Sequence, residues 1–186
     1  YRFVGRLEGL LREYELPASC LELELTESVL QTGSHTIRTL EQLRASGVAV
    51  ALDDFGTGYS SLASLQNLPL SRVKLDRSLI AGIDDGARAA AIARATIVLC
   101  RTLGLEVTAE GVERLEQLAM LLPHRGISLQ GYLFARPVSG QDLIPLLGPL
   151  GASCQELKRS AQKLPQAKFA TRTGERRKGS LTLLAD

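Results

Sequence analysis

Histidine and cysteine, which build zinc sites and disulfide frameworks, are scarce in this sequence: its 186 residues include two histidines and three cysteines. His35 and His124 do not lie in a cluster of ligand-type residues. This argues against a zinc site, because zinc prefers histidine and cysteine ligands. Cys20, Cys100 and Cys154 are odd in number and widely spaced. We therefore expect free thiols in a reducing compartment, with no disulfide framework and no catalytic cysteine–histidine pair.

Long hydrophobic runs are also absent, although 45% of the residues are hydrophobic. No apolar run is long enough to cross a bilayer, and the first residues do not form a signal-peptide pattern. The charged fraction of 23% is ordinary for a globular protein, and the length suits one domain with a sizeable core. We expect a cytoplasmic globular chain, which a longer protein could anchor to a membrane through upstream segments.

Positive charge is concentrated at the C-terminal end. From residue 151 onward there are eight basic and three acidic residues, so this part carries about +5 and the preceding part about −3 of the total of +2. We place one domain over residues 1–150 and a basic tail over 151–186. The tail is expected to contain a short helix and a disordered part, at 155–164 and 167–179. A solvated tail is the preferred interpretation and contact with an anionic membrane or nucleic acid the alternative, but with Phe169 as its only aromatic residue nucleic acid is not expected.

Strand-like and helix-like patterns alternate along the chain. Short runs of apolar or alternating residues predict strands at 21–27, 48–52, 72–76, 105–113 and 127–132. Apolar residues at helical spacing predict helices at 4–11, 37–44, 87–103, 115–122 and 141–147. This alternation predicts a parallel sheet with helices outside it, a fold whose chemistry lies at the carboxyl ends of the strands.

Acidic residues gather at these predicted strand ends. Asp53 and Asp54 directly follow the apolar run at 48–52 and precede the glycines Gly56 and Gly58. Neighbouring carboxylates repel each other unless a cation or a shared proton compensates, so the pair indicates a site. A turn with an acidic helix cap is the alternative. Other polar residues at strand ends are Glu24, Lys74, Asp76, Glu110, Glu113 and Gln130.

Five motifs in series resemble the EAL-domain family of bacterial cyclic di-GMP phosphodiesterases and receptors. They are Glu-Leu-Thr-Glu at 24–27, Asp-Asp-Phe-Gly-Thr-Gly at 53–58, Lys-Leu-Asp at 74–76, Glu-Gly-Val-Glu at 110–113 and Gln-Gly-Tyr-Leu-Phe at 130–134. The resemblance covers residues 1–147 and implies the family's fold, a modified TIM barrel.

The resemblance also implies a set of metal ligands and catalytic residues. Glu24 and Asp53 match metal ligands of the family, with Asp53 between two ions. Asp54 would hold the second ion, and Glu110 resembles its ligand or the base that handles the attacking water. Lys74 matches the lysine that holds or activates that water. Carboxylate oxygens suit Mg²⁺ or Mn²⁺, and two such ions can activate water and stabilise phosphoryl charge. Ca²⁺ is expected to inhibit.

Further residues match positions around that centre. Asp76, Glu113 and Gln130 resemble residues on the substrate side or behind the metal ligands, and Glu27 resembles the glutamate that anchors the next loop. Arg136 follows the matching segment Tyr-Leu-Phe-Ala and is either a phosphate contact or a surface arginine. The loop that couples the site to dimer contacts in the family corresponds here to Phe55, Gly56, Thr57, Gly58 and Tyr59.

The chain departs from the family pattern at its start. It contains no Glu-Ala-Leu tripeptide, and its single asparagine, Asn67, does not match the asparagine ligand of the family's second strand. We therefore expect the first two barrel strands to be missing, which leaves an open remnant of six strands and two metal ligands fewer. A TIM barrel takes about 250 residues, and the chain is expected to be a fragment or a degenerate product.

The resemblance implies a phosphodiesterase domain that opens cyclic di-GMP to linear pGpG with two divalent metal ions. The alternatives are a catalytically inactive cyclic di-GMP receptor, or regulatory interaction module, and a structural remnant without a ligand. The resemblance further implies a homodimer and an upstream sensory or GGDEF domain in a longer chain.

Overall fold

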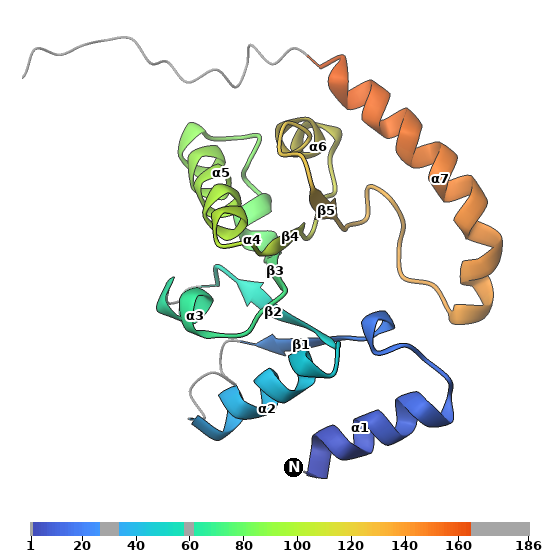
Figure 1. Cartoon of the computed structure of the whole chain (residues 1–186). Coiled ribbons are helices and arrows are strands. Elements are labelled where there is room, and N and C mark those ends of the chain that lie inside the picture. The colour runs from blue at the N-terminus through green and yellow to red at the C-terminus, as the bar shows by residue number, and fades with distance from the viewer. Residues whose placement is uncertain (1, 27–33, 58–61, 165–186) are drawn as a thin grey trace, which may run out of the picture.

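The computed structural model describes residues 2–26, 34–57 and 62–164 of the chain. Strands and helices alternate along it, as the sequence predicts (Figure 1). The strands are β1 (Glu22–Thr26), β2 (Ala49–Phe55), β3 (Arg72–Leu75), β4 (Glu106–Ala109) and β5 (Ile127–Leu129). The helices are α1 (Arg2–Glu13), α2 (Ser34–Ala45), α3 (Leu62–Asn67), α4 (Arg77–Ile80), α5 (Ala87–Thr102), α6 (Leu115–Leu121) and α7 (Gly140–Gln162), with a 3-10 turn at Ala18–Cys20.

The strands form one parallel sheet in the order β1-β2-β3-β4-β5. Each strand pairs with the next strand along the chain. The helical segment between two strands carries the chain back to the end of the sheet where the first strand began, so that the next strand runs parallel to it. Helices α2, α3, α5 and α6 lie along the outer side of the sheet, and α7 contacts α6 beyond the β5 end of the sheet (Figure 1). The sheet within the described residues has five strands, one fewer than the six expected from a barrel that lacks its first two.

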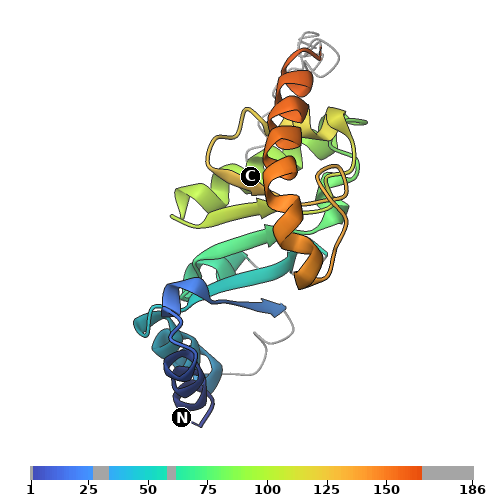
Figure 2. The same ribbon diagram turned by 90° about the vertical axis from the view of Figure 1, so that its right-hand side faces the viewer.

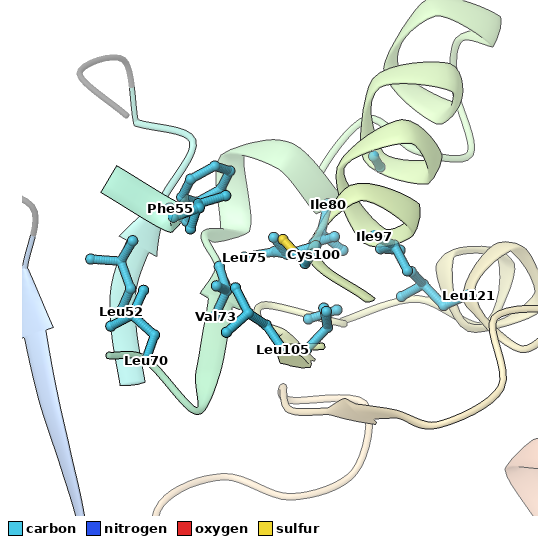
Figure 3. Close-up of a cluster of buried hydrophobic side chains, with 14 of the residues drawn as sticks. Leu52, Phe55, Leu70, Val73, Leu75, Ile80, Ile97, Cys100, Leu105 and Leu121 are labelled. Atoms are coloured by element: carbon cyan, nitrogen blue, oxygen red, sulfur yellow. The ribbon is translucent and has the colours of Figure 1, made fainter. Parts of the chain in front are cut away.

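The main core lies between the sheet and its outer helices. Alternate strand residues such as Leu52, Val73 and Leu75 are fully buried and point toward this layer. Ile97 and Leu121 belong to the same core cluster from the helix side (Figure 3). Side chains alternate between the faces of a strand, so the residues between these apolar positions lie on the inner face. Polar residues such as Lys74 therefore lie on the inner face of the sheet.

Helix α7 differs from the sequence-based expectation. The helix predicted to end at residue 147 continues through Pro145 and Pro149 as one helix to Gln162. Ser139 begins it as an N-cap, accepting a hydrogen bond from the backbone N–H of Asp142. Each proline removes one backbone donor, and the remaining hydrogen bonds of a long helix tolerate these losses. The boundary placed at residue 150 stays a prediction, and residues 165–186 of the tail lie outside the described part.

The C-terminal half of α7 packs against the rest of the domain, whereas its N-terminal half does not. In Figures 1 and 2 the helix runs along the side of the domain that faces away from α5. Leu157 and Ala161 join the core cluster, whereas Ile144 and Leu147 are exposed. No helix among the described residues combines the length and apolar character needed to cross a membrane.

The three cysteines differ enough in burial for their labelling to test the fold. All three are free: Cys20 is exposed, Cys154 is intermediate and Cys100 is buried. Burial raises the pKa of Cys100 to about 11. At pH 8 we therefore expect a thiol reagent to modify Cys20 quickly and Cys154 more slowly, while Cys100 reacts only after denaturation. Mass spectrometry of the labelled peptides measures this order, and native labelling of Cys100 at the rate of Cys20 would contradict the fold.

Candidate active site

Lys74 lies at the centre of the candidate site, on the inner face of β3. Its neighbours Val73 and Leu75 are fully buried on the outer face, so the alternation of the strand directs Lys74 to the opposite side. The side chain of Lys74 is only 10% exposed. A buried ammonium group is costly unless it is paired and hydrogen-bonded, so its partners define the site.

Three carboxylates from three different segments surround this ammonium group. Nζ of Lys74 lies 2.8 Å from Oε1 of Glu24, 3.0 Å from Oδ1 of Asp53 and 2.9 Å from Oε1 of Glu110. Glu24 belongs to β1 and Asp53 to β2, and Glu110 directly follows β4. The parallel pairing of these strands with β3 brings their carboxyl ends together. The structure thus unites four of the residues that the sequence singled out.

The charges of this cluster are unequal. Burial alone would lower the pKa of Lys74, but its contacts with Glu24, Glu110 and Asp53 outweigh burial and raise this pKa above its usual value. Lys74 therefore remains an ammonium ion at neutral pH. One positive charge faces three acidic groups, so the cluster can accommodate further positive charge.

The chemistry of the cluster fits a hard divalent cation. Oδ1 of Asp53 is buried and, among the described residues, accepts no hydrogen bond of normal geometry, although it forms the ion pair with Lys74. Buried acceptors usually have such a partner. Carboxylate oxygens are the ligands that Mg²⁺ and Mn²⁺ prefer. In the part of the chain that is described, no group of three or more acidic, histidine or cysteine side chains forms a ready-made metal cluster. The three carboxylates share the ammonium group of Lys74 as their partner.

Asp54 lies apart from this cluster. Its backbone has a φ of 56°, in the left-handed region, and the pairing of β2 with β3 shifts register between Leu52 and Phe55. Such an irregularity re-aims the residues around it. Asp54 is exposed, and its carbonyl oxygen accepts hydrogen bonds from the N–H and Oγ1 of Thr57. The ammonium group of Lys74 contacts Asp53 but not Asp54, and the expected metal-binding role of Asp54 stays a prediction.

The loop after β2 is described only as far as Thr57. Phe55 is buried in the core cluster, which agrees with a packing role. Gly56 has a φ of 106°, and an added Cβ would collide with the side chain of Leu79. Glycine is therefore the residue that fits this turn. The remaining predicted loop residues, Gly58 and Tyr59, and the predicted loop anchor Glu27 lie outside the described residues.

Asp76 caps a helix and is not part of the strand. The predicted strand at 72–76 ends at Leu75, and Asp76 is the N-cap of α4, with its Oδ1 accepting a hydrogen bond from the Ser78 N–H at 2.8 Å. Hydrogen bonding to the side chain of Ser78, and then to its backbone N–H, holds the pKa of Asp76 below its usual range. The acidic-cap interpretation, raised for Asp53 and Asp54, thus applies to Asp76.

The other predicted site residues make contacts outside the Lys74 cluster. Glu113 forms a 3.5 Å ion pair with Arg77. Gln130 links strands through its backbone, donating to the carbonyl of Ala109. Arg136 is exposed and stacks 4.5 Å from the centre of the Tyr132 ring. Their roles near a substrate stay predictions.

The sequence did not single out two polar residues that form notable contacts in the structure, Arg72 and Gln117. Arg72 lies two residues before Lys74 and forms ion pairs with Glu22 and Glu106. Its period-two relation to Lys74 was an available signal. The second is Gln117, which is buried on α6. Its place near the start of a predicted helix was the only signal, and nothing local indicated its burial.

Sequence comparison relates this chain to cyclic di-GMP signalling proteins. The family model described as the EAL domain matches residues 2–137. Cyclic di-GMP phosphodiesterase NbdA of Pseudomonas aeruginosa is 47% identical over 136 residues, which are 73% of this chain and 17% of NbdA. The bifunctional diguanylate cyclase/cyclic di-GMP phosphodiesterase MucR of the same species is 42% identical over 142 residues, 76% of this chain and 21% of MucR. The chain thus spans about a fifth of these relatives.

Solved structures of EAL proteins are also similar to this chain. The EAL enzyme Bd1971 bound to cAMP and cyclic di-GMP superposes with a TM-score of 0.75 and 36% identity, over 78% of this chain and 39% of that one. The PaMucR phosphodiesterase in complex with c-di-GMP has a TM-score of 0.69 and 41% identity, over 75% and 57% of the two chains. Klebsiella pneumoniae BlrP1 with manganese and cyclic di-GMP has a TM-score of 0.65 and 36% identity, over 72% and 34%.

These likenesses confirm the predicted TIM-like α/β fold. The described sheet covers only part of such a barrel, in keeping with the share of each solved chain that is matched. The match of the family model to residues 2–137 covers most of the sequence, including all four residues of the Lys74 cluster. The chain belongs to the EAL domain family.

Proposed function

We propose that the protein containing this chain hydrolyses cyclic di-GMP to linear pGpG. The observation that carries the proposal is the cluster of Lys74 with Glu24, Asp53 and Glu110 at the carboxyl ends of parallel strands. Family membership and the c-di-GMP complex of the related PaMucR phosphodiesterase support the choice of substrate. Because the chain spans only about a fifth of its curated relatives, the activity is proposed for the whole protein.

Each residue of the cluster has a part in this proposal. Glu24, Asp53 and the neighbouring Asp54 would hold Mg²⁺ or Mn²⁺, and related structures with manganese and with calcium support a divalent ion. Such ions, when bound, neutralise charge on the phosphoryl oxygens and make water a better nucleophile. Glu110 accepts the proton of the attacking water, and Lys74 orients that water and donates hydrogen bonds to developing negative charge. Ca²⁺ would bind without supporting turnover.

The proposal extends to partners of the longer protein. A second copy of the chain is proposed as the dimer partner, near the loop that begins at Phe55. An upstream sensory or GGDEF domain is proposed as the regulatory element, and MucR, described as both cyclase and phosphodiesterase, supports this arrangement. Arg136, Gln130 and Glu113 are proposed to lie on the substrate side of the site, and Asp76 behind it.

Replacing Asp53 by asparagine tests the proposed function. Asp53→Asn keeps the size of the side chain but removes the charge of a carboxylate that contacts Lys74. We expect hydrolysis of cyclic di-GMP in Mn²⁺ to fall by at least about 100-fold, since both charge balance and metal binding are weakened. The rate of pGpG formation, measured by chromatography, gives the result.

Glu106→Gln is the matched control, because it makes the same carboxylate-to-amide change at the other end of the sheet. Glu106 is 67% exposed and pairs with Arg72, away from the cluster. Its variant should hydrolyse cyclic di-GMP within about threefold of the unmodified protein, as exposed ion pairs contribute little. Equal turnover by the Asp53 and Glu106 variants would refute the assigned site.

A further inference from the structure

Gln117 is a buried polar residue in an otherwise apolar part of α6. It is 1% exposed, and its helix neighbours Leu118 and Leu121 are buried as well. A buried amide is costly unless its hydrogen bonds are made, so a glutamine at this position needs partners for both ends of its side chain.

The amide of Gln117 finds partners on two separate segments. Its Oε1 accepts hydrogen bonds from the backbone N–H groups of Glu113 at 2.8 Å and Arg114 at 3.0 Å. Its Nε2 donates to the backbone carbonyls of Ile80 at 3.3 Å and Ala81 at 3.4 Å. The two N–H groups require an acceptor and the two carbonyls a donor, so these contacts fix the orientation of the amide.

The two segments joined by Gln117 carry two members of the Lys74 cluster. Ile80 and Ala81 end helix α4, which begins just after the strand that holds Lys74. Glu113 and Arg114 follow Glu110 by three and four residues. Gln117 therefore spans from the segment after β3 to the segment after β4. Movement between these segments would alter the 2.9 Å contact of Lys74 with Glu110.

A second link runs in parallel on the surface. The guanidinium of Arg114 donates to the carbonyl of Ala81 at 2.7 Å and to Oδ2 of Asp84 at 2.9 Å. Helix α4 has only four residues, too few to be stable by themselves. Its C-terminal carbonyls lack partners within the helix, and Gln117 and Arg114 supply donors for them.

The stretch between Glu110 and Gln117 is short and closely held. Val112 is fully buried, and its N–H donates to the carbonyl of Gln130 at 3.0 Å. Gly111 has a φ of 68°, which allows the chain to turn between Glu110 and this buried anchor. A displacement of Glu113 would therefore reach Glu110 through only two intervening residues.

We infer that Gln117 is a positioning residue for the proposed hydrolysis: its buried amide holds the segment carrying Glu110 against the segment carrying Lys74. Its four hydrogen bonds are all to backbone atoms, and it acts through the alignment of Glu110. The inference rests on the proposed function for its catalytic consequence, while the two-segment link itself can be measured independently.

The test compares Gln117→Met, Gln117→Glu and the control Leu118→Val in the full-length protein. The methionine variant keeps the volume but loses all four hydrogen bonds, and the glutamate variant keeps the acceptor for Glu113 and Arg114 but loses the donor. Leu118→Val loosens the same helix without removing a polar contact. We expect kcat for cyclic di-GMP to fall about 10- to 100-fold in Gln117→Met and less in Gln117→Glu, with KM within about threefold.

Leu118→Val should lower the melting temperature but leave kcat within about threefold, because loss of packing alone does not misalign Glu110. Assays are run well below every melting temperature. Equal kcat values for Gln117→Met and Leu118→Val would overturn the inference, since Gln117 would then serve stability alone.

Amide hydrogen exchange separates this inference from the proposed function. Gln117→Met should increase exchange at Glu113 and Arg114 at least tenfold more than Leu118→Val does, whether or not the protein hydrolyses cyclic di-GMP. If the unmodified protein shows no turnover, the proposed function fails, and unchanged exchange at these two amides would overturn the link made by Gln117.

Discussion

Replacing Lys74 by methionine should reduce hydrolysis of cyclic di-GMP by at least about 1,000-fold. Lys74 supplies the positive charge that faces Glu24, Asp53 and Glu110, all within 3.0 Å of its Nζ. Methionine has a similar length but neither charge nor donors, so the three carboxylates lose their shared partner. The measurement is the steady-state rate of pGpG formation at saturating Mn²⁺, with circular dichroism as the check on folding.

Lys158→Met is the matched control for this substitution. Lys158 lies on α7 and is exposed, so removing its charge should leave the rate within about twofold, as for most surface substitutions. A Lys74 variant that is folded and turns over within tenfold of the unmodified protein would show that the ammonium group is dispensable, and the assigned chemistry would be wrong.

Gly131→Ala should lower the free energy of unfolding by roughly 3 kcal/mol, more than any other substitution considered above. An added Cβ would lie 2.7 Å from the carbonyl carbon of Val112 and closer still to its N and O atoms. These are backbone atoms, and the hydrogen bonds Val112 N–Gln130 O and Leu133 N–Val112 O hold them in place. The chain must shift to relieve the clash. Urea denaturation followed by circular dichroism measures the loss.

Gly148→Ala makes the same substitution where there is space. Gly148 lies within α7, and an added Cβ would meet nothing within 4 Å. Alanine favours a helix over glycine, so the variant should be as stable as the unmodified protein or up to about 1 kcal/mol more stable. Equal destabilisation by the two substitutions would contradict the close approach of Gly131 to Val112.

The centre of the site could be predicted from the sequence because it depends on regular structure. Alternation along a strand places Lys74 and Glu24 on the inner face, and parallel pairing brings the ends of β1, β2 and β4 next to β3. The apolar run before Asp53 marked a buried strand, and β2 confirms it. Both inferences need only local patterns and the general rule for parallel sheets.

The irregular features could not be predicted in this way. Asp54 has a φ of 56° and lies where the pairing of β2 with β3 shifts register. No pattern of residue types in the sequence predicts this conformation for an aspartate. Helix α7 passes Pro149, where propensity favours an end. The hydrogen bond from Gln117 to Ile80 spans 37 residues, and no local pattern in the sequence indicates it.

The most direct test of the proposed hydrolysis is to identify the product that the full-length protein forms from cyclic di-GMP in Mn²⁺. We predict linear pGpG, whose formation stops when the metal is chelated and when Lys74 is replaced by methionine. The contradicting result is tight binding of cyclic di-GMP, seen by calorimetry, with no pGpG in Mn²⁺ or Mg²⁺. The Lys74 cluster would then belong to a receptor and not to a hydrolase.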